Sequence, residues 1–162
     1  MISEQEQKVY DVLEELGLAY ERFEHPPVYT VEEAQQYWKD IDAMHCKNLF
    51  LRNNKGNMHY LVILEETKQA DLGRLSELLL AGRLSFASDR RLTQYLGLES
   101  GAVSPFGLIN DADRAVTVAL DKDIKRAKAV SFHPNVNTAT ISFSTEDFLK
   151  FLKHCGNEII FI

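Results

Sequence analysis

The spacing of hydrophobic and polar residues, with capping residues between the segments, predicts a chain that alternates between helices and strands. The first helix follows a capping box of Ser3 and Glu6, whose side chains satisfy free amides at a helix start. Its hydrophobic residues recur every three or four positions on one face, and Gly17 suits its end because glycine adopts the left-handed conformation at little cost. Four more helices are predicted to begin at capping residues, namely Thr30, Asp71, Ser88 or Asp89, and Ser144.

Short apolar runs bounded by turn residues predict the strands. Two of them, Cys46–Asn53 and Met58–Leu64, flank the turn Asn54–Gly56, and their nearly continuous apolar content predicts central strands covered on both faces. Several connections are too short for a parallel crossover, so we expect an α/β protein of the α+β type, with a mixed, mostly antiparallel sheet surrounded by helices. The other strand candidates are Tyr20–Glu24, Leu84–Ala87, Val103–Ile109, Ala115–Leu120, Ala129–Phe132, Thr138–Phe143 and an edge strand at Ile159–Ile162.

Length and composition indicate one globular domain that spans residues 1–162. Hydrophobic residues make up 45% of the chain and charged residues 26%, which excludes a disordered or fibrous protein. A chain of this length buries enough surface to fold without a disulfide or a metal ion. The two cysteines, Cys46 and Cys155, form no CxxC pair, which excludes a disulfide scaffold and a cysteine-type zinc site.

The cellular compartment follows from the same residues. Two cysteines without a disulfide pattern favour a reducing environment. No apolar run approaches the roughly 20 residues that a membrane span needs, and the first ten residues have neither the basic nor the apolar region of a secretory signal. We therefore expect a soluble cytoplasmic protein without a membrane partner.

The formal net charge of −6 argues against a protein that coats nucleic acid, and we expect no DNA partner. The charge is uneven, because residues 1–42 hold 11 acidic and 3 basic side chains, whereas residues 43–162 hold 13 acidic and 15 basic ones. The second part of the chain can therefore accept a polyanion on one face. Its basic clusters are either solvated surface, which is the more frequent case, or phosphate contacts. They are Lys122, Lys125, Arg126 and Lys128, and the pair Arg90–Arg91.

The common catalytic and cofactor motifs are absent from the sequence. It contains no GxGxxG or GxxxxGK[ST] loop for phosphates, no HExxH metal motif and no GxSxG nucleophile elbow. Its five histidines show no metal-ligand spacing. We therefore expect neither a metal nor a cofactor.

Three segments contain residues that plain scaffold rarely needs. Lys47 enters an otherwise apolar strand, where its ammonium must reach solvent or meet an anion. The segment Gly101–Gly107 contains two glycines and a proline, which fix either a tight structural turn or a loop whose amides converge on a carbonyl oxygen. The segment Phe132–Asn135 places His133 and Asn135 at a sheet end, either as functional groups or as an Asx turn with a surface histidine.

Together these segments resemble the YbaK / prolyl-tRNA-synthetase-associated editing domain family, and within it the free-standing alanyl-tRNA(Pro) deacylases. The resemblance runs from about residue 4 to residue 155, the Lys, GxxxP and HPN positions all match, and Asn157–Ile162 matches least. The segments that carry it are Cys46–Arg52, His59–Val62, Arg83–Ser88, Tyr95–Leu98, Gly101–Asn110, Asp121–Asp123 and Phe132–Thr140.

The resemblance implies the fold of that family and an enzyme, an aminoacyl-tRNA deacylase that cleaves the ester between a wrongly attached amino acid and the terminal ribose of tRNA. The expected substrate is alanine on tRNA(Pro), bound at the 3′ CCA end, with prolyl-tRNA synthetase as a further partner to consider. An apolar pocket discriminates a missing methylene by only about 1–3 kcal/mol, so the synthetase needs a second sieve.

The resemblance also assigns roles by position. Lys47 would bind the CCA end as a point charge, and Gly101 and Pro105 would hold the substrate carbonyl and stabilise the oxyanion. His133 would orient the terminal adenosine and help to position water, while assistance from the ribose 2′-hydroxyl leaves its role as a general base open. The expected substrate-binding residues are Ala102, Val103, Ser104, Phe106, Asn135, Thr30 and Val31, the last of which core packing also explains.

Two alternatives remain open at this stage. The same fold could clear Cys-tRNA(Pro), or tRNA carrying another small residue such as serine. A non-catalytic module that holds tRNA ends or docks on a synthetase would bind tRNA without hydrolysing any ester.

Overall fold

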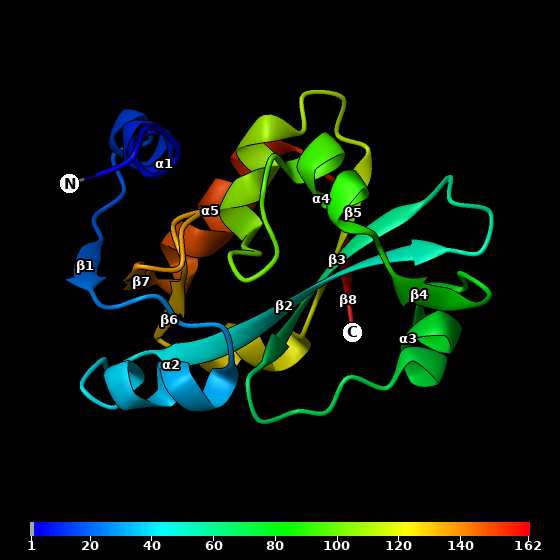
Figure 1. The fold of residues 1–162 in the computed structure, drawn as a ribbon, viewed down its shortest axis with the longest axis horizontal. Coiled ribbons are helices and arrows are strands. Elements are labelled where there is room, and N and C mark those ends of the chain that lie inside the picture. Colours follow the sequence, from blue (N-terminus) through cyan, green and yellow to red (C-terminus); the bar gives the residue numbers. More distant parts are fainter. Residues whose placement is uncertain (1) are drawn as a thin grey trace.

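The computed structural model describes residues 2–162 (Figure 1). Its helices are α1 (Glu4–Glu15), α2 (Val31–Trp38), α3 (Leu72–Leu79), α4 (Asp89–Leu96) and α5 (Thr145–Cys155), with 3-10 helices η1 (Pro105–Asn110) and η2 (Lys122–Arg126). Its strands are β1 (Glu21–Glu24), β2 (Met44–Asn53), β3 (His59–Glu65), β4 (Leu84–Phe86), β5 (Val116–Leu120), β6 (Ala129–Phe132), β7 (Ala139–Ser144) and β8 (Ile159–Phe161).

The strands form one mixed sheet in the order β1-β7-β6-β2-β3-β5-β8, with β4 paired to β2. The pairs β1–β7, β6–β7, β2–β3 and β2–β4 are antiparallel, and the pairs β2–β6, β3–β5 and β5–β8 are parallel. The hairpin of β2 and β3 is in register from Cys46↔Glu65 to Arg52↔His59. These pairings confirm the mixed, mostly antiparallel sheet and the edge position of β8.

Local capping chemistry sets the helix boundaries as the sequence predicts. Each helix-start side chain accepts a hydrogen bond from the backbone N–H three residues later. The five capping residues are Ser3, Thr30, Asp71, Ser88 and Ser144. Left-handed glycines follow the ends of α1, α4 and α5, at Gly17, Gly97 and Gly156.

The two faces of the sheet are covered differently. On one face, α1, α4, η1 and α5 pack over a large core that includes Leu13, Leu96 and Phe148. On the other face, α3 covers β2 and β3 through Leu75 and Leu79, while α2 covers a separate small cluster. Figure 1 shows α2 and α3 at opposite ends of the long strand β2.

The strand predicted at Val103–Ile109 is wrong, because most of that segment forms η1. Ser104 Oγ accepts the N–H of Phe106 at 3.1 Å, and Pro105 occupies the first helical position, where its missing N–H costs nothing. The hydrophobic residues of the segment enter the core from this turn, and Phe106 packs edge-on against Phe151 with 5.1 Å between ring centroids.

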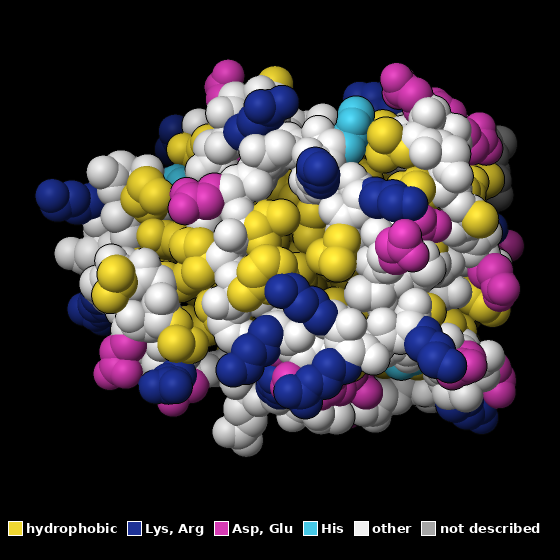
Figure 2. All heavy atoms as spheres, turned by 180° about the vertical axis from the view of Figure 1, so that it is seen from behind, with side chains coloured by type: hydrophobic (Ala, Val, Ile, Leu, Met, Phe, Trp, Pro, Cys, Tyr) yellow, Lys and Arg dark blue, Asp and Glu magenta, His cyan; other side chains and the backbone are white. Residues whose placement is uncertain are grey.

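The face turned away in Figure 1 has apolar side chains gathered in a central hollow, with lysine and arginine side chains around it (Figure 2). The basic residues of η2 make local contacts. Lys125 Nζ lies 3.6 Å from the centroid of the Phe161 ring, and Arg126 lies 3.6 Å from the Asp123 carboxylate. Among residues 2–162, none of the helices combines the length and apolar character required to cross a bilayer.

Replacing Phe106 with alanine should lower the free energy of unfolding by about 3–5 kcal/mol, because the fully buried ring would leave a cavity. Chemical denaturation measures this loss. Phe86→Ala is the matched control, since that ring is 61% exposed. Equal losses in the two variants would contradict the placement of Phe106 in the core.

Candidate active site

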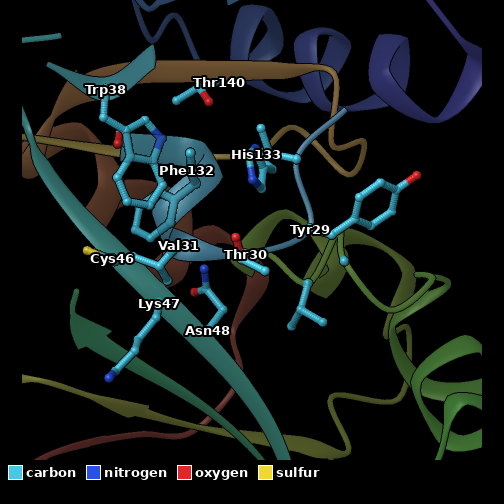
Figure 3. A pocket seen from close by; sticks show the side chains of 15 residues that line it. Tyr29, Thr30, Val31, Trp38, Cys46, Lys47, Asn48, Phe132, His133 and Thr140 are labelled. Atoms are coloured by element: carbon cyan, nitrogen blue, oxygen red, sulfur yellow. The ribbon is translucent and has the colours of Figure 1, made fainter. Parts of the chain in front are cut away.

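A cavity of about 200 Å³ opens where β2 and β6 stop pairing. The two strands pair only at Met44↔Val130 and His45↔Ser131, after which they diverge. The next residues of both strands face the gap, with α2 and the preceding loop on one side and the 101–103 segment on another (Figure 3). The lining residues are Val28, Tyr29, Thr30, Val31, Ala34, Trp38, Cys46, Lys47, Asn48, Gly101, Val103, Ser131, Phe132, His133 and Thr140.

Strand alternation explains why β6 contributes both to the core and to the cavity. Successive side chains of a strand point to opposite faces, so Val130 and Phe132 reach the large core. Ser131 lies between them in sequence and points to the other face, where its hydroxyl meets Nδ1 of His45. The His45 ring stacks on Trp38 of α2 with 4.6 Å between centroids, which fixes α2 over the cavity.

His133 is held as a neutral imidazole with a free acceptor nitrogen. Its Nδ1 lies 2.9 Å from the carbonyl oxygen of Ala139, which can only accept, so Nδ1 carries the proton and Nε2 keeps a lone pair. Burial lowers the pKa of His133 below its ordinary value, and the nearby His25 ring lowers it further, against the opposing effect of the Ala139 carbonyl. The imidazole can therefore accept a hydrogen bond or a proton near neutral pH.

His25 forms a second fixed imidazole beside the first. Its Nδ1 donates to the carbonyl of Pro26 at 2.9 Å, and its Nε2 shares a hydrogen bond with the hydroxyl of Thr140, also at 2.9 Å. The ring centroids of His25 and His133 are 5.8 Å apart. His25 thereby holds Thr140 at the cavity wall.

Lys47 is the one lysine or arginine among the lining residues. Within residues 2–162 its ammonium has neither a hydrogen bond nor an ion pair, in contrast to Lys68, which contacts Asp121 and Asp123. Figure 3 shows its side chain running from β2 away from His133. The cation therefore lies at the edge of the cavity, where it can meet an anion of a bound molecule.

The 101–106 segment divides between the cavity and the core. Gly101 and Val103 line the cavity, whereas Ala102, Ser104, Pro105 and Phe106 are buried outside the lining. Gly101 has a φ of +91°, which favours glycine. Within residues 2–162 the N–H groups of Gly101 and Val103 have no hydrogen-bond acceptor, whereas the N–H of Ala102 bonds to the Glu99 carbonyl. Two amide donors of the loop are thus available beside the cavity.

The other expected site residues are also divided. Thr30 and Val31 line the cavity at the start of α2. Asn135 does not, because it is buried against a separate cavity of about 220 Å³ that Gln5 and Lys8 also line. The structure therefore brings together Lys47, Gly101, Val103, His133, Thr30 and Val31 from the expected set.

Several lining residues were missed by the sequence analysis. Asn48 follows Lys47 directly, and its side-chain oxygen is buried without a hydrogen-bond partner in the part of the chain that is described. Ser131 lies two residues before His133, which directly follows β6, so the alternation of an extended chain directs both side chains to one side. Adjacency and alternation were signals for these two residues, and adjacency to Thr30 was a signal for Tyr29, whereas Thr140 reaches the site only through the tertiary fold.

The cavity has few ionisable groups besides Lys47 and His133. Burial and nearby carboxylates raise the pKa of the Cys46 thiol far above its ordinary value, so it is not a thiolate nucleophile at neutral pH. No carboxylate lines the cavity. Among residues 2–162, the His, Cys, Asp and Glu side chains form no group of three or more that could hold a metal ion. The available chemistry consists of a neutral base, one cation, hydroxyls, an amide and two backbone donors.

Comparisons with known proteins identify related sequences. Residues 25–151 match the family model of the aminoacyl-tRNA editing domain. The chain is 44% identical over 152 residues to the prolyl-tRNA editing protein ProX of Acetoanaerobium sticklandii, covering 93% of this chain and 92% of that protein. It is 34% identical to prolyl-tRNA synthetase associated domain-containing protein 1 of Bos taurus, covering 91% and 88%.

Solved structures share the fold at lower identity. A crystal structure described as a candidate trans-editing enzyme for prolyl-tRNA synthetase superposes with a TM-score of 0.75 at 22% identity and covers 99% of this chain and 97% of its own. The hypothetical protein APE2540 superposes with a TM-score of 0.73 at 20% identity, covering 94% and 96%.

We expect Asn135→Gly to preserve the fold better than Asn135→Ala. Asn135 has a φ of +62°, which asparagine and glycine adopt more readily than alanine, and its N–H closes the turn onto the His133 carbonyl at 2.9 Å. The alanine variant should lose about 1–2 kcal/mol of unfolding free energy in urea denaturation. A glycine variant less stable than the alanine variant would show that the side chain, not the backbone conformation, is what the position requires.

Stability should fall as pH decreases from about 7.5 to about 5.5. Burial lowers the pKa of His45, His59 and His133 in the folded chain, so the unfolded chain binds more protons below its ordinary histidine pKa of about 6.5. The contribution of these histidines to stability is therefore fully present above that pH and is lost as the pH falls below it. Urea denaturation at both pH values measures the slope, which His133→Asn should reduce. An unchanged slope in that variant would contradict the lowered pKa.

Proposed function

The chain belongs to the aminoacyl-tRNA editing domain family, and on this premise we propose that it is a free-standing deacylase that hydrolyses Ala-tRNA(Pro). The reaction class is hydrolysis of a carboxylic ester between the amino acid and the terminal ribose. The observation that carries the proposal is the cavity itself, because Lys47, Gly101 and His133 come from three distant segments of the chain and line one small site.

Each group has a role that its geometry supports. The free N–H groups of Gly101 and Val103 would stabilise the oxyanion that develops on the ester carbonyl. Lys47, at the edge of the cavity, would bind a phosphate or ribose oxygen of the 3′ CCA end. Pro105 would act indirectly, because it fixes the start of η1 and so the course of the loop.

Hydrolysis needs a water molecule positioned at the ester carbonyl. Water adds to the carbonyl carbon, the tetrahedral intermediate collapses, and the ribose oxygen leaves with a proton. His133 Nε2 carries the lone pair of a neutral imidazole and would accept a hydrogen bond from the water or from the neighbouring ribose 2′-hydroxyl. The 2′-hydroxyl is attached next to the reacting ester, so proximity supplies much of the assistance.

The size of the cavity supports a small amino acid as substrate. Its volume of about 200 Å³ must hold the aminoacyl group and part of the ribose. Val31 and Ala34 contribute apolar wall beside Thr30, which suits a methyl side chain and restricts the space for a prolyl ring. A site of this kind supplies the second sieve that discrimination by binding alone cannot provide.

The tRNA is a polyanion, and the acidic and basic side chains of the protein are unevenly distributed, so only part of the protein surface can accept it. The acidic first 42 residues disfavour close contact with the acceptor stem, so recognition would centre on the CCA end. Prolyl-tRNA synthetase would be the partner that releases the mischarged tRNA.

Lys47→Ala should lower kcat/KM for Ala-tRNA(Pro) by about 10- to 100-fold, the loss expected for one charge-assisted contact. The assay compares tRNA(Pro) charged with alanine, cysteine, serine and proline, and circular dichroism checks that the variant is folded. Lys153→Ala, which removes an exposed lysine of α5 outside the cavity, is the matched control and should keep full activity.

The panel of charged tRNAs separates the proposed function from its alternatives. Hydrolysis of the alanyl ester with sparing of the prolyl ester is the expected result. Faster hydrolysis of the cysteinyl or seryl ester would indicate a deacylase with that other substrate. Binding of tRNA without any hydrolysis would indicate a non-catalytic module. Full activity of a folded Lys47→Ala protein would contradict the proposed role of Lys47 in binding the substrate.

A further inference from the structure

Tyr29 is the exposed aromatic residue of the cavity rim. Its side chain is 71% exposed, whereas Trp38 and Phe132 of the same lining are buried. Figure 3 shows the ring standing at the entrance, with its hydroxyl directed away from the other labelled side chains. Within residues 2–162 the hydroxyl has no hydrogen-bond partner, so nothing in the described chain explains why this ring stays in water.

The backbone beneath this ring is held firmly. The carbonyl oxygen of Asn137 accepts the N–H of Val28 at 3.3 Å, and the side-chain amide of Asn137 donates to the Val28 carbonyl at 3.2 Å. The N–H of Tyr29 donates to the Glu33 carboxylate at 2.9 Å. A methyl group at Gly101 would lie 3.4 Å from Cδ1 of Tyr29, so the ring rests beside the Gly101 backbone. The ring therefore presents an exposed aromatic surface, on a held backbone, next to the loop that the oxyanion would contact.

The cavity is too small for the whole 3′ end of the substrate. Sites that enclose drug-sized ligands measure about 300–1,000 Å³, and this cavity measures about 200 Å³. With the aminoacyl ester inside, the ribose would lie at the entrance and the adenine outside, within reach of the rim. Unpaired bases at nucleic-acid ends are typically bound by stacking on aromatic side chains.

We propose that Tyr29 is the stacking platform for the terminal adenine of the aminoacylated 3′ end. The assignment rests on the proposed function, since it requires the ester to lie between Gly101 and His133. Stacking uses the face of the ring and not its hydroxyl, so phenylalanine and tryptophan should replace tyrosine. It also tolerates any base, because every base has an aromatic face.

The first experiment measures deacylation of Ala-tRNA(Pro) by Tyr29→Ala, Tyr29→Phe and Tyr29→Trp. We expect kcat/KM to fall about 5- to 100-fold in the alanine variant, the range for loss of one stacked base, and to stay within about threefold in the other two. Phe86→Ala removes another exposed aromatic ring, on β4, and is the matched control that should leave the rate unchanged.

The second experiment isolates the base. Titration calorimetry measures binding of 3′-alanylamino-3′-deoxyadenosine, which cannot be hydrolysed, and of the analogue in which hydrogen replaces adenine. Tyr29→Ala should weaken the first ligand by the same factor as kcat/KM and leave the second unchanged. A structural role of Tyr29 would weaken both ligands equally, and this result would overturn the proposal.

The two experiments distinguish failure of the inference from failure of the proposed function. A wild-type protein that does not hydrolyse Ala-tRNA(Pro) would refute the proposed function, while the two ligands would still decide whether adenine contacts Tyr29. If the wild-type protein is active, a Tyr29→Ala variant that hydrolyses the substrate as fast as the wild type would overturn the stacking role. A loss of activity in Tyr29→Phe would overturn it as well.

Discussion

The divergence of β2 from β6 is the constraint on which the candidate site depends. The strands share only the pairs Met44↔Val130 and His45↔Ser131, although both continue beyond them. Beyond that point β2 remains paired with β3, and β6 remains paired with β7, so each edge of the gap is anchored in a sheet. A cavity bordered by two hydrogen-bonded strands keeps its shape without a ligand, which is the preorganisation that catalysis requires.

The electrostatics of the cavity follow from this placement. His133 lies where a strand leaves the core, and burial therefore favours its neutral form. Lys47 lies on the opposite strand, with its flexible side chain at the edge, and its charge stays hydrated. In the proposed function these two groups would act as a neutral acceptor inside the cavity and a cation outside it. That order suits a substrate whose neutral ester enters first and whose phosphates follow.

Sequence patterns predict the local features of this fold and miss those that depend on distant contacts. Capping residues predict helix starts, because the hydrogen bond of Ser144 to the Asp147 amide depends only on nearby residues. The segment after Val103 was misread because a run of apolar residues does not reveal whether Pro105 begins a strand or a helical turn. Thr140 could not be recognised as a lining residue, since its position depends on how β7 pairs with β6, whereas Asn48 and Tyr29 directly neighbour the expected site residues Lys47 and Thr30.

The interior and the rim of the cavity satisfy different physical demands. In the proposed function the interior would have to distinguish two small side chains, and the buried Ala34 is a wall residue whose position the fold fixes. In the same proposal the rim would hold a flexible single strand, for which exposed groups with broad surfaces or mobile charges, such as Tyr29 and Lys47, are suited. Because binding energy from remote parts of a substrate can orient the reacting group, a site this small needs its rim for affinity. The proposal therefore assigns selectivity and affinity to different residues of the same cavity.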